Sequence, residues 1–163
     1  MMEEKEKAWK TVSSKYLFRR PWLTVRCEDM LLPNGNHIPE YYILEYPDWV
    51  NTIAITKDGK FVFVRQYRPG LGRTSYELCA GVCDKEDASP LVSAQRELWE
   101  ETGYGKGNWQ EYMVISANPS THTNLTHCFL ATDVEPIDHQ HLEDTEDLSV
   151  HLDRKSTRLN SSH

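Results

Sequence analysis

Apolar residues of this chain gather in short segments that are separated by turn residues. Segments at 23–32, 37–46 and 50–56 are rich in β-branched and aromatic residues. They are divided by Pro33-Asn34-Gly35-Asn36 and by Tyr46-Pro47-Asp48. This pattern predicts strands joined by turns, and the Asn-Gly pair supplies the positive φ that a tight hairpin requires.

More strands are predicted along the rest of the chain. Lys57-Asp58-Gly59-Lys60 is a second turn of the same kind, and it leads into an apolar run at 61–67. Because that run is continuous, it is typical of a strand that is buried on both faces. Further strands are predicted at 75–80, 111–116, 127–132 and 148–152.

One strong helix signal lies between Ser89 and Gly103. Ser89 is a favoured N-cap, and Pro90 suits the first helical position. Gly103 supplies a left-handed stop after about thirteen residues. The sequence therefore predicts a β-rich α/β fold of the α+β kind, in which a sheet carries one central helix.

Three carboxylates share one face of this predicted helix. At about 100° per residue, Glu100 and Glu101 lie within about 60° of Glu97. Like charges at this spacing cost a few tenths of a kcal/mol each, and a bound cation reverses that cost. Carboxylate oxygens suit Mg²⁺, with Mn²⁺ as a second option. For a Glu-Glu pair taken alone, a solvated helix face is the alternative.

Length and composition indicate an ordinary globular chain. Its 163 residues fit one domain, and the net charge of −7 argues against a nucleic-acid partner. The first ten residues are too charged for a signal peptide, and no apolar run is long enough for a membrane span, so we expect a cytoplasmic protein. The cysteines are Cys27, Cys79, Cys83 and Cys128. Their spacing fits neither a zinc site nor a disulfide scaffold, which predicts buried free thiols.

The segment at 153–163 resembles, residue for residue, the translation of a common sequencing-adapter oligonucleotide. We therefore leave it out of the fold prediction and expect the natural chain to continue past Leu152. A genuine polar tail is the alternative. The predicted organisation is N-terminal strands at 1–48, a catalytic domain at 49–152 and the adapter-derived segment.

The segment from Gly81 to Tyr104 resembles the Nudix box, and its second half, Arg96 to Gly103, matches in full. Asp87 stands where the box has its first Glu, and one extra residue separates Gly81 from Arg96. Both departures fall in the loop before the helix, where an insertion is tolerated. The resemblance implies a Nudix-type α/β/α sandwich with a central mixed sheet, preceded by antiparallel strands and lacking its C-terminal helix.

Outside the box, the chain resembles the ADP-ribose pyrophosphatase branch of that family. The similar runs are Val64-Arg65-Gln66-Tyr67-Arg68 and Tyr76-Glu77-Leu78-Cys79-Ala80-Gly81. The resemblance implies that Arg68 and Glu77 bind substrate and that the backbone carbonyl of Ala80 ligates metal. For Arg68, a surface charge at a strand edge is the alternative.

The acidic run at 142–148 resembles a loop of the same branch that supplies one more metal ligand and a general base. Glu146 is the implied ligand, and Asp144 or Glu143 is the implied base. A solvated acidic loop is the alternative. The implied metal ligands are Ala80, Glu97, Glu100, Glu101 and Glu146. The implied catalytic residues are Glu100, Glu101, Asp144 and Glu143.

The implied reaction is Mg²⁺-dependent hydrolysis of a nucleoside diphosphate derivative, with ADP-ribose cleaved to AMP and ribose 5-phosphate. Tyr41-Tyr42 stands where that branch commonly has an Arg-Glu pair, so other nucleoside diphosphate sugars and dinucleotides stay open as substrates. A Nudix-fold nucleotide sensor that does not cleave its ligand is the alternative from a different class. The resemblance also implies a homodimer formed through the N-terminal strands, with no membrane partner.

Overall fold

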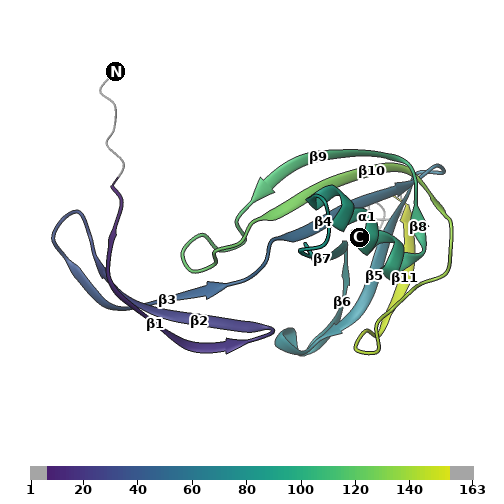
Figure 1. Ribbon diagram of the computed structural model, residues 1–163. Coiled ribbons are helices and arrows are strands. Elements are labelled where there is room, and N and C mark those ends of the chain that lie inside the picture. Colours follow the sequence, from purple (N-terminus) through teal and green to yellow (C-terminus); the bar gives the residue numbers. More distant parts are fainter. Residues whose placement is uncertain (1–6, 155–163) are drawn as a thin grey trace, which may run out of the picture. The chain divides into compact units, whose positions relative to one another are not determined.

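The computed structural model describes residues 7–154, and these fall into two compact units (Figure 1). Unit 1 contains the described residues up to Tyr46 together with Ser116–Asn124. Unit 2 contains Pro47–Ile115 and the described residues from Leu125 onward. Of the segment that resembles an adapter translation, the first two residues end the last strand, and 155–163 lie outside the described residues.

Unit 1 is built on a three-stranded antiparallel sheet in the order β1-β2-β3. The strands are β1 (Lys10–Arg20), β2 (Leu23–Leu31) and β3 (His37–Glu45). The last two confirm predicted strands, and Gly35 between them has the expected positive φ, 84°. The segment 116–124 joins this unit through Leu44, whose backbone N–H donates to the carbonyl of Thr121 at 2.8 Å.

Strand β1 is not predicted by the hydrophobic pattern. All of its residues are exposed, so its sequence carries no alternation between a buried and a solvated face. Pairing with β2 defines it instead, and the register shifts between Thr11 and Ser13 and again between Tyr16 and Phe18. A strand that rests on backbone pairing leaves little trace in side-chain periodicity.

Unit 2 contains a mixed sheet, as predicted. Its central path runs β11-β5-β4-β10-β8, with β6 paired to β5, β7 to β4 and β9 to β10 (Figure 1). Strands β4 and β10 are parallel, and the other pairs are antiparallel. The strands are β4 (Trp49–Thr56), β5 (Lys60–Arg68), β6 (Arg73–Glu77), β7 (Cys79–Val82), β8 (Tyr104–Gly105), β9 (Asn108–Ile115), β10 (Thr126–Pro136) and β11 (Leu148–Arg154).

The single strand predicted at 75–80 is wrong, because the structure has two strands there. Strand β6 pairs with β5, whereas β7, which is separated from β6 by the single residue Leu78, pairs with β4. The apolar pattern runs through Leu78 without a break, so it does not reveal that the chain changes partners there. This change of pairing partner brings β7 beside the helix. Earlier in the chain, a short 3₁₀ turn (Pro69–Leu71) links β5 to β6.

The predicted helix is confirmed as α1 (Pro90–Thr102), the one α-helix of residues 7–154. The Ser89 hydroxyl accepts a hydrogen bond from the Val92 backbone N–H at 3.4 Å. At the other end Gly103 has φ 72° and donates its N–H to the carbonyl of Trp99 at 2.8 Å. Within residues 7–154, no helix has the length and apolar character needed to cross a membrane.

The core of unit 2 lies between α1 and one face of the sheet. Leu98 of α1 is fully buried against Val62 of β5 and other small apolar residues. Strand β5 alternates: Val62 and Val64 are buried, whereas Phe61 and Phe63 are partly exposed. The prediction that this strand is buried on both faces is therefore wrong for the described chain, because successive side chains point to opposite faces and α1 covers only one.

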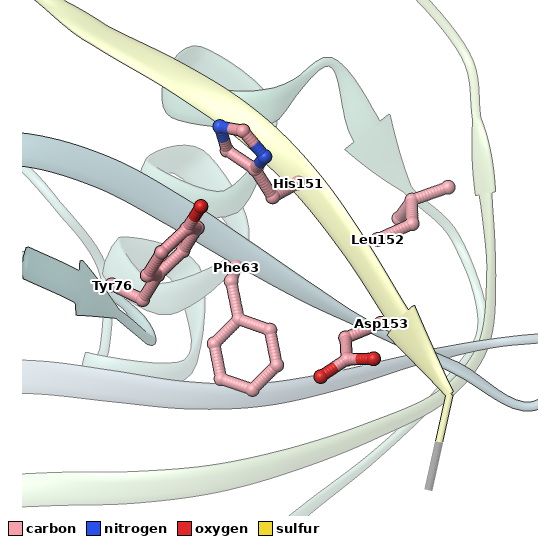
Figure 2. Close-up of a pocket in the computed structure, with 5 residues that line it drawn as sticks. All are labelled: Phe63, Tyr76, His151, Leu152 and Asp153. Carbon is pink, nitrogen blue, oxygen red and sulfur yellow. The ribbon is translucent and has the colours of Figure 1, made fainter. Parts of the chain in front are cut away.

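The face of β5 opposite α1 carries a surface pocket. Phe63 is paired in register with His151 of β11, and Tyr76 of β6 contacts His151 edge-on at 5.1 Å between ring centroids. Figure 2 shows these three rings around the pocket, with Leu152 and Asp153 completing its lining. The pocket contains none of the predicted site residues, which lie elsewhere on unit 2.

Candidate active site

Glu97 of α1 meets the backbone of β7. Its Oε1 accepts a hydrogen bond from the Val82 N–H at 3.2 Å. Gly81 makes this approach possible, because a Cβ at that position would overlap the Glu97 carboxylate. The glycine that opens the box-like segment is thus required by close packing of strand and helix, and not by an unusual backbone conformation.

Arg96 links two of the three helix carboxylates. Its Nη1 donates to Glu97 Oε1 at 3.1 Å and to Glu100 Oε2 at 2.9 Å. Burial disfavours the guanidinium charge, but the negative charges of Glu97 and its other acidic partners prevail and raise the pKa of Arg96. One guanidinium therefore relieves repulsion along the acidic face of α1.

The other side of Arg96 holds the loop that precedes the helix. Its Nε and Nη2 both lie 3.1 Å from Asp87 Oδ2, and Nη2 also donates to the Val82 carbonyl at 2.9 Å. Asp84 is a further ion-pair partner at 3.1 Å. Asp87, which stands where the box has a Glu, thus fastens the lengthened loop to the helix.

Glu101 is the most deeply placed of the three acids. Its residue is 4% exposed, and its Oε2 accepts a hydrogen bond from the Ala80 N–H at 3.3 Å. Burial raises the pKa of Glu101 to about 7, and the negative charges of Glu97 and Glu146 act in the same direction. Hydrogen bonds from the Cys79 thiol and from Ala80 oppose the rise.

Glu97 is also destabilised as an anion. Burial is the main cause that raises its pKa, and the charge of Glu100 adds to it, although Arg96 opposes both. A partly buried and a buried carboxylate whose ionised forms are disfavoured suit a cation, because a nearby positive charge restores the ionised form.

The donor set fits a divalent cation that prefers oxygen ligands. Carboxylate oxygens of Glu97, Glu100 and Glu101 lie on one helical face beside the backbone of Ala80. The sequence pattern did not indicate that a cysteine lies next to them. Burial raises the pKa of the Cys79 thiol well above its usual range, so this residue is a neutral hydrogen-bond donor and not a thiolate ligand.

Arg68 and Glu77 form a paired unit at the edge of this region. Arg68 Nε lies 3.0 Å from both Glu77 carboxylate oxygens, and Nη2 lies 2.7 Å from Oε2. Ser75 also donates to Glu77, at 2.6 Å. The hydrogen bond with Glu77 is the main cause that raises the pKa of Arg68, and the charge of Glu101 contributes. Arg68 is therefore oriented by Glu77, and its charge interacts with that of Glu101.

The acidic loop lies near the helix through Glu146, whose charge raises the pKa of Glu101. The Glu146 carboxylate accepts a hydrogen bond from the backbone N–H of Glu143 at 3.0 Å, which closes a tight turn. Within residues 7–154, the exposed side chains of Glu143 and Asp144 have no hydrogen bond or ion pair. Glu146 therefore acts on Glu101 through its charge, whereas its carboxylate bonds within its own loop, and the side chains of the two candidate bases are exposed.

Three contributors to the site were not assigned a role from the sequence. They are the Arg96 guanidinium, the Cys79 thiol and the Val82 backbone N–H. Only Arg96 had a sequence signal, its place in the Arg-Glu pair of the motif. The other two depend on how β7 packs against α1, which local pattern does not specify.

Two known family models match the chain. The NUDIX domain model matches residues 46–154, and the model of the nucleoside diphosphate sugar hydrolase N-terminal domain matches residues 9–44. The first match covers more than half of the chain, which therefore belongs to the Nudix family of hydrolases. Nudix hydrolases generally use a divalent metal ion, in agreement with the donor set.

Individual relatives give a finer comparison. The ADP-ribose pyrophosphatase of Bacillus subtilis (strain 168) is 32% identical over 129 residues, which cover 79% of this chain and 69% of the relative. The methanol dehydrogenase activator of Bacillus methanolicus is 33% identical over 122 residues, which cover 75% of this chain and 65% of the relative. The chain thus spans about two thirds of each relative's length.

A solved structure supports the fold. The crystal structure of an ADP compounds hydrolase matches with a TM-score of 0.81, covering 96% of this chain and 84% of that chain. At 21% identity the likeness establishes the architecture and says nothing about the ligand.

Glu101→Gln is expected to stabilise the metal-free protein at alkaline pH. The pKa of Glu101 is about 7 in the fold, against an ordinary value of 4.5, so the wild type loses stability as pH rises from about 4.5 to about 7. With a chelator at pH 8, urea unfolding should show Glu101→Gln more stable by about 1–3 kcal/mol. The difference should vanish near pH 4.5.

The matched control is Glu111→Gln, which changes a carboxylate that is 44% exposed. It should show no such gain with rising pH. A Glu101→Gln variant that is less stable than the wild type at pH 8 would contradict the assignment of Glu101 as a destabilised buried anion.

Proposed function

We propose that this protein hydrolyses the diphosphate bond of a nucleoside diphosphate derivative, with ADP-ribose cleaved to AMP and ribose 5-phosphate. The observation that carries the proposal is the pair of helix carboxylates, Glu97 and the buried Glu101, whose ionised forms are disfavoured until a cation joins them. A diphosphate carries the negative charge that a bound Mg²⁺ would share with these acids.

The proposed metal ligands are the carboxylates of Glu97, Glu100, Glu101 and Glu146 together with the Ala80 carbonyl. This set is supported by the convergence of α1, β7 and the acidic loop. Mg²⁺, or Mn²⁺ in its place, would neutralise the diphosphate and lower the pKa of a bound water.

Other side chains bind the substrate and move the proton. Arg68 is the proposed phosphate ligand, because its planar guanidinium suits phosphate oxygens, and Glu77 fixes its orientation. Asp144 or Glu143 accepts a proton from the attacking water. One phosphorus–oxygen bond of the anhydride breaks, and the bridging oxygen leaves with one of the two phosphate products.

The substrate assignment draws on the comparisons. One relative is named an ADP-ribose pyrophosphatase, and the model that matches the N-terminal region is described as belonging to nucleoside diphosphate sugar hydrolases. ADP-ribose is itself a nucleoside diphosphate sugar, so both descriptions agree on the substrate class. Tyr41-Tyr42 stands where the branch commonly has an Arg-Glu pair, and Tyr42 is 44% exposed on β3, so other nucleoside diphosphate sugars and dinucleotides are the alternative substrates.

We also propose that unit 1 pairs with unit 1 of a second copy. Strand β1 is an edge strand, and large apolar side chains are exposed along it and in the turn that follows. They are Val12, Tyr16, Leu17, Phe18 and Trp22. An edge strand with exposed aromatic residues favours association over solvent exposure.

A cytoplasmic location is proposed as well. All four cysteines are free thiols, three of them buried, which suits a compartment that keeps thiols reduced. Recovery of the protein in a membrane or secreted fraction of its source cells would contradict this location.

Hydrolysis should be measured with Mg²⁺ over a panel of ADP-ribose, other nucleoside diphosphate sugars and dinucleotides. We expect ADP-ribose to be cleaved fastest, yielding AMP. Glu101→Gln should keep the fold, judged by circular dichroism, while lowering kcat by at least about 100-fold, because it removes a charge that holds the cation. Glu111→Gln, the exposed control, should keep nearly full activity.

Near-normal turnover by Glu101→Gln would overturn the metal assignment. The alternative of a nucleotide sensor would be supported if the wild type bound ADP-ribose saturably but did not cleave it, both with Mg²⁺ and with Mn²⁺.

Arg68→Ala is expected to lower kcat/KM for the best substrate by about 10- to 100-fold, because a charge-assisted contact to phosphate is lost. Arg73→Ala is the matched control, since Arg73 is exposed and pairs with Arg68 in the register of β5 and β6. It should change kcat/KM by less than about threefold. Equal losses in the two variants would show that general positive charge at this edge matters, and not the Arg68–Glu77 unit.

The double variant Phe18→Lys/Trp22→Lys should convert a dimer to a monomer, because two charges would have to be buried at the proposed interface. Light scattering coupled to size-exclusion chromatography measures the mass. Leu71→Lys, at a residue that is 63% exposed in unit 2, is the control and should leave the mass unchanged. A monomeric wild type would exclude the proposed dimer.

A further inference from the structure

Two histidines and an aspartate meet in the segment that follows β10. Asp138 lies between them: its Oδ1 is 2.7 Å from His139 Nδ1, and its Oδ2 is 2.9 Å from His141 Nε2. The two imidazole rings are tilted against each other with centroids 4.3 Å apart. One potential ligand atom from each of the three residues lies within 4.8 Å of the others.

The ligand chemistry of this cluster differs from that of the carboxylate site. Imidazole nitrogen is a preferred ligand of Zn²⁺, Ni²⁺ and Cu²⁺, whereas Mg²⁺ takes oxygen ligands. Two imidazoles and one carboxylate form a three-ligand set that leaves a further coordination position for water. None of the carboxylates assigned to the Mg²⁺ site belongs to this cluster.

The three side chains are accessible to an ion from solvent. Their exposed fractions are 39% for Asp138, 79% for His139 and 31% for His141. An ion with a Zn–N distance of about 2.0 Å needs only modest side-chain rotation to reach ligand atoms with this spacing. It would replace the contacts that the Asp138 carboxylate now makes with the two rings.

The backbone of the cluster is held on the last turn of α1. The N–H groups of Ile137 and Asp138 donate to the Gly103 carbonyl at 2.9 and 3.1 Å, and the His141 N–H donates to the Glu100 carbonyl at 2.8 Å. The three ligands are therefore presented by an ordered segment, which lowers the entropy lost when a metal binds.

Two side chains add to this attachment. Gln140 Nε2 donates to the Glu101 carbonyl at 2.6 Å. The ring of Trp99 packs against that of His141 with centroids 4.2 Å apart. The cluster therefore touches the helix turn that carries two of the proposed Mg²⁺ ligands, and a tryptophan lies beside it.

We propose that Asp138, His139 and His141 form a second metal site, which binds a transition-metal dication such as Zn²⁺ or Ni²⁺. Its three ligands all come from the segment after β10, which backbone hydrogen bonds attach to the C-terminal turn of α1. Because the fold holds the three ligand atoms within 4.8 Å of one another, the ion binds the folded chain more tightly than the unfolded chain, and its binding stabilises unit 2.

Ni²⁺ is the probe, since it prefers imidazole and does not change oxidation state under these conditions. Isothermal titration calorimetry should use the full chain without a histidine tag, at pH 7.5 and with millimolar Mg²⁺ to occupy the carboxylate site. We expect one Ni²⁺ per chain. His139→Ala and His141→Ala should each weaken binding at least tenfold, and Asp138→Asn by about 10- to 100-fold.

Two controls separate this site from other binding. His37→Ala removes a histidine that is 2.7 Å from Asp29 and that belongs to no metal-ligand group among residues 7–154, and it should leave Ni²⁺ affinity unchanged. Glu101→Gln should also leave it unchanged, because that residue belongs to the Mg²⁺ site. Failure of the proposed hydrolysis would therefore not alter the result of this titration.

Two further measurements test whether Ni²⁺ binds at this cluster. Ni²⁺ at about 100-fold excess over its dissociation constant should raise the Tm of the wild type by about 5 °C, but not that of the His139→Ala/His141→Ala double variant. Ni²⁺ should quench tryptophan fluorescence in the wild type, and Trp99→Phe should remove most of the quenching.

The proposal is overturned by an absence of saturable Ni²⁺ binding to the wild type. It is equally overturned if the folded double variant binds Ni²⁺ as tightly as the wild type, or if Glu101→Gln abolishes the binding. Circular dichroism of each variant confirms that it is folded, and His139→Ala, at the most exposed ligand, is the variant least able to disturb the chain.

Discussion

A single guanidinium holds together the part of this molecule on which the proposed chemistry depends. Arg96 lies between Glu97 and Glu100 on one side and Asp87 on the other, while the carbonyl of Val82 accepts from it as well. Without that cation the acids of one helical face would repel one another close to a buried surface. The loop before α1 would also lose its fastening to the helix.

Strand β7 also helps to accommodate the carboxylates of α1. Its backbone N–H groups at Ala80 and Val82 each donate to one carboxylate oxygen, of Glu101 and Glu97 respectively, and its glycine leaves room for Glu97. Within residues 7–154 Glu101 makes no ion pair, and it takes its hydrogen bonds from Cys79 and Ala80. Part of the charge on α1 is thus neutralised internally, and the remainder is left for an external cation.

Local sequence signals were sufficient for the elements with clear ends. Ser89, Pro90 and Gly103 predicted the limits of α1, and helical periodicity placed its three acids on one face. The hairpin turn at Gly35 was likewise predicted from its Asn-Gly pair. Such features depend on a few neighbouring residues, which is why a pattern in the sequence can reveal them.

Features set by distant parts of the chain could not be predicted in this way. Strand β1 is exposed throughout and exists because β2 pairs with it. The break at Leu78 reflects a change of partner from β5 to β4. The Cys79 thiol reaches Glu101 only because β7 packs on α1, and one-sided burial of β5 depends on which layers cover the sheet.

The position of Arg96 has a consequence for the folded chain without a metal ion. Since the guanidinium already bonds to Glu97, Glu100 and Asp87, the helix and its loop are joined by contacts that need no divalent ion. An ion that bound at the proposed site would therefore meet carboxylates already in position, and its loss would not require the chain to refold.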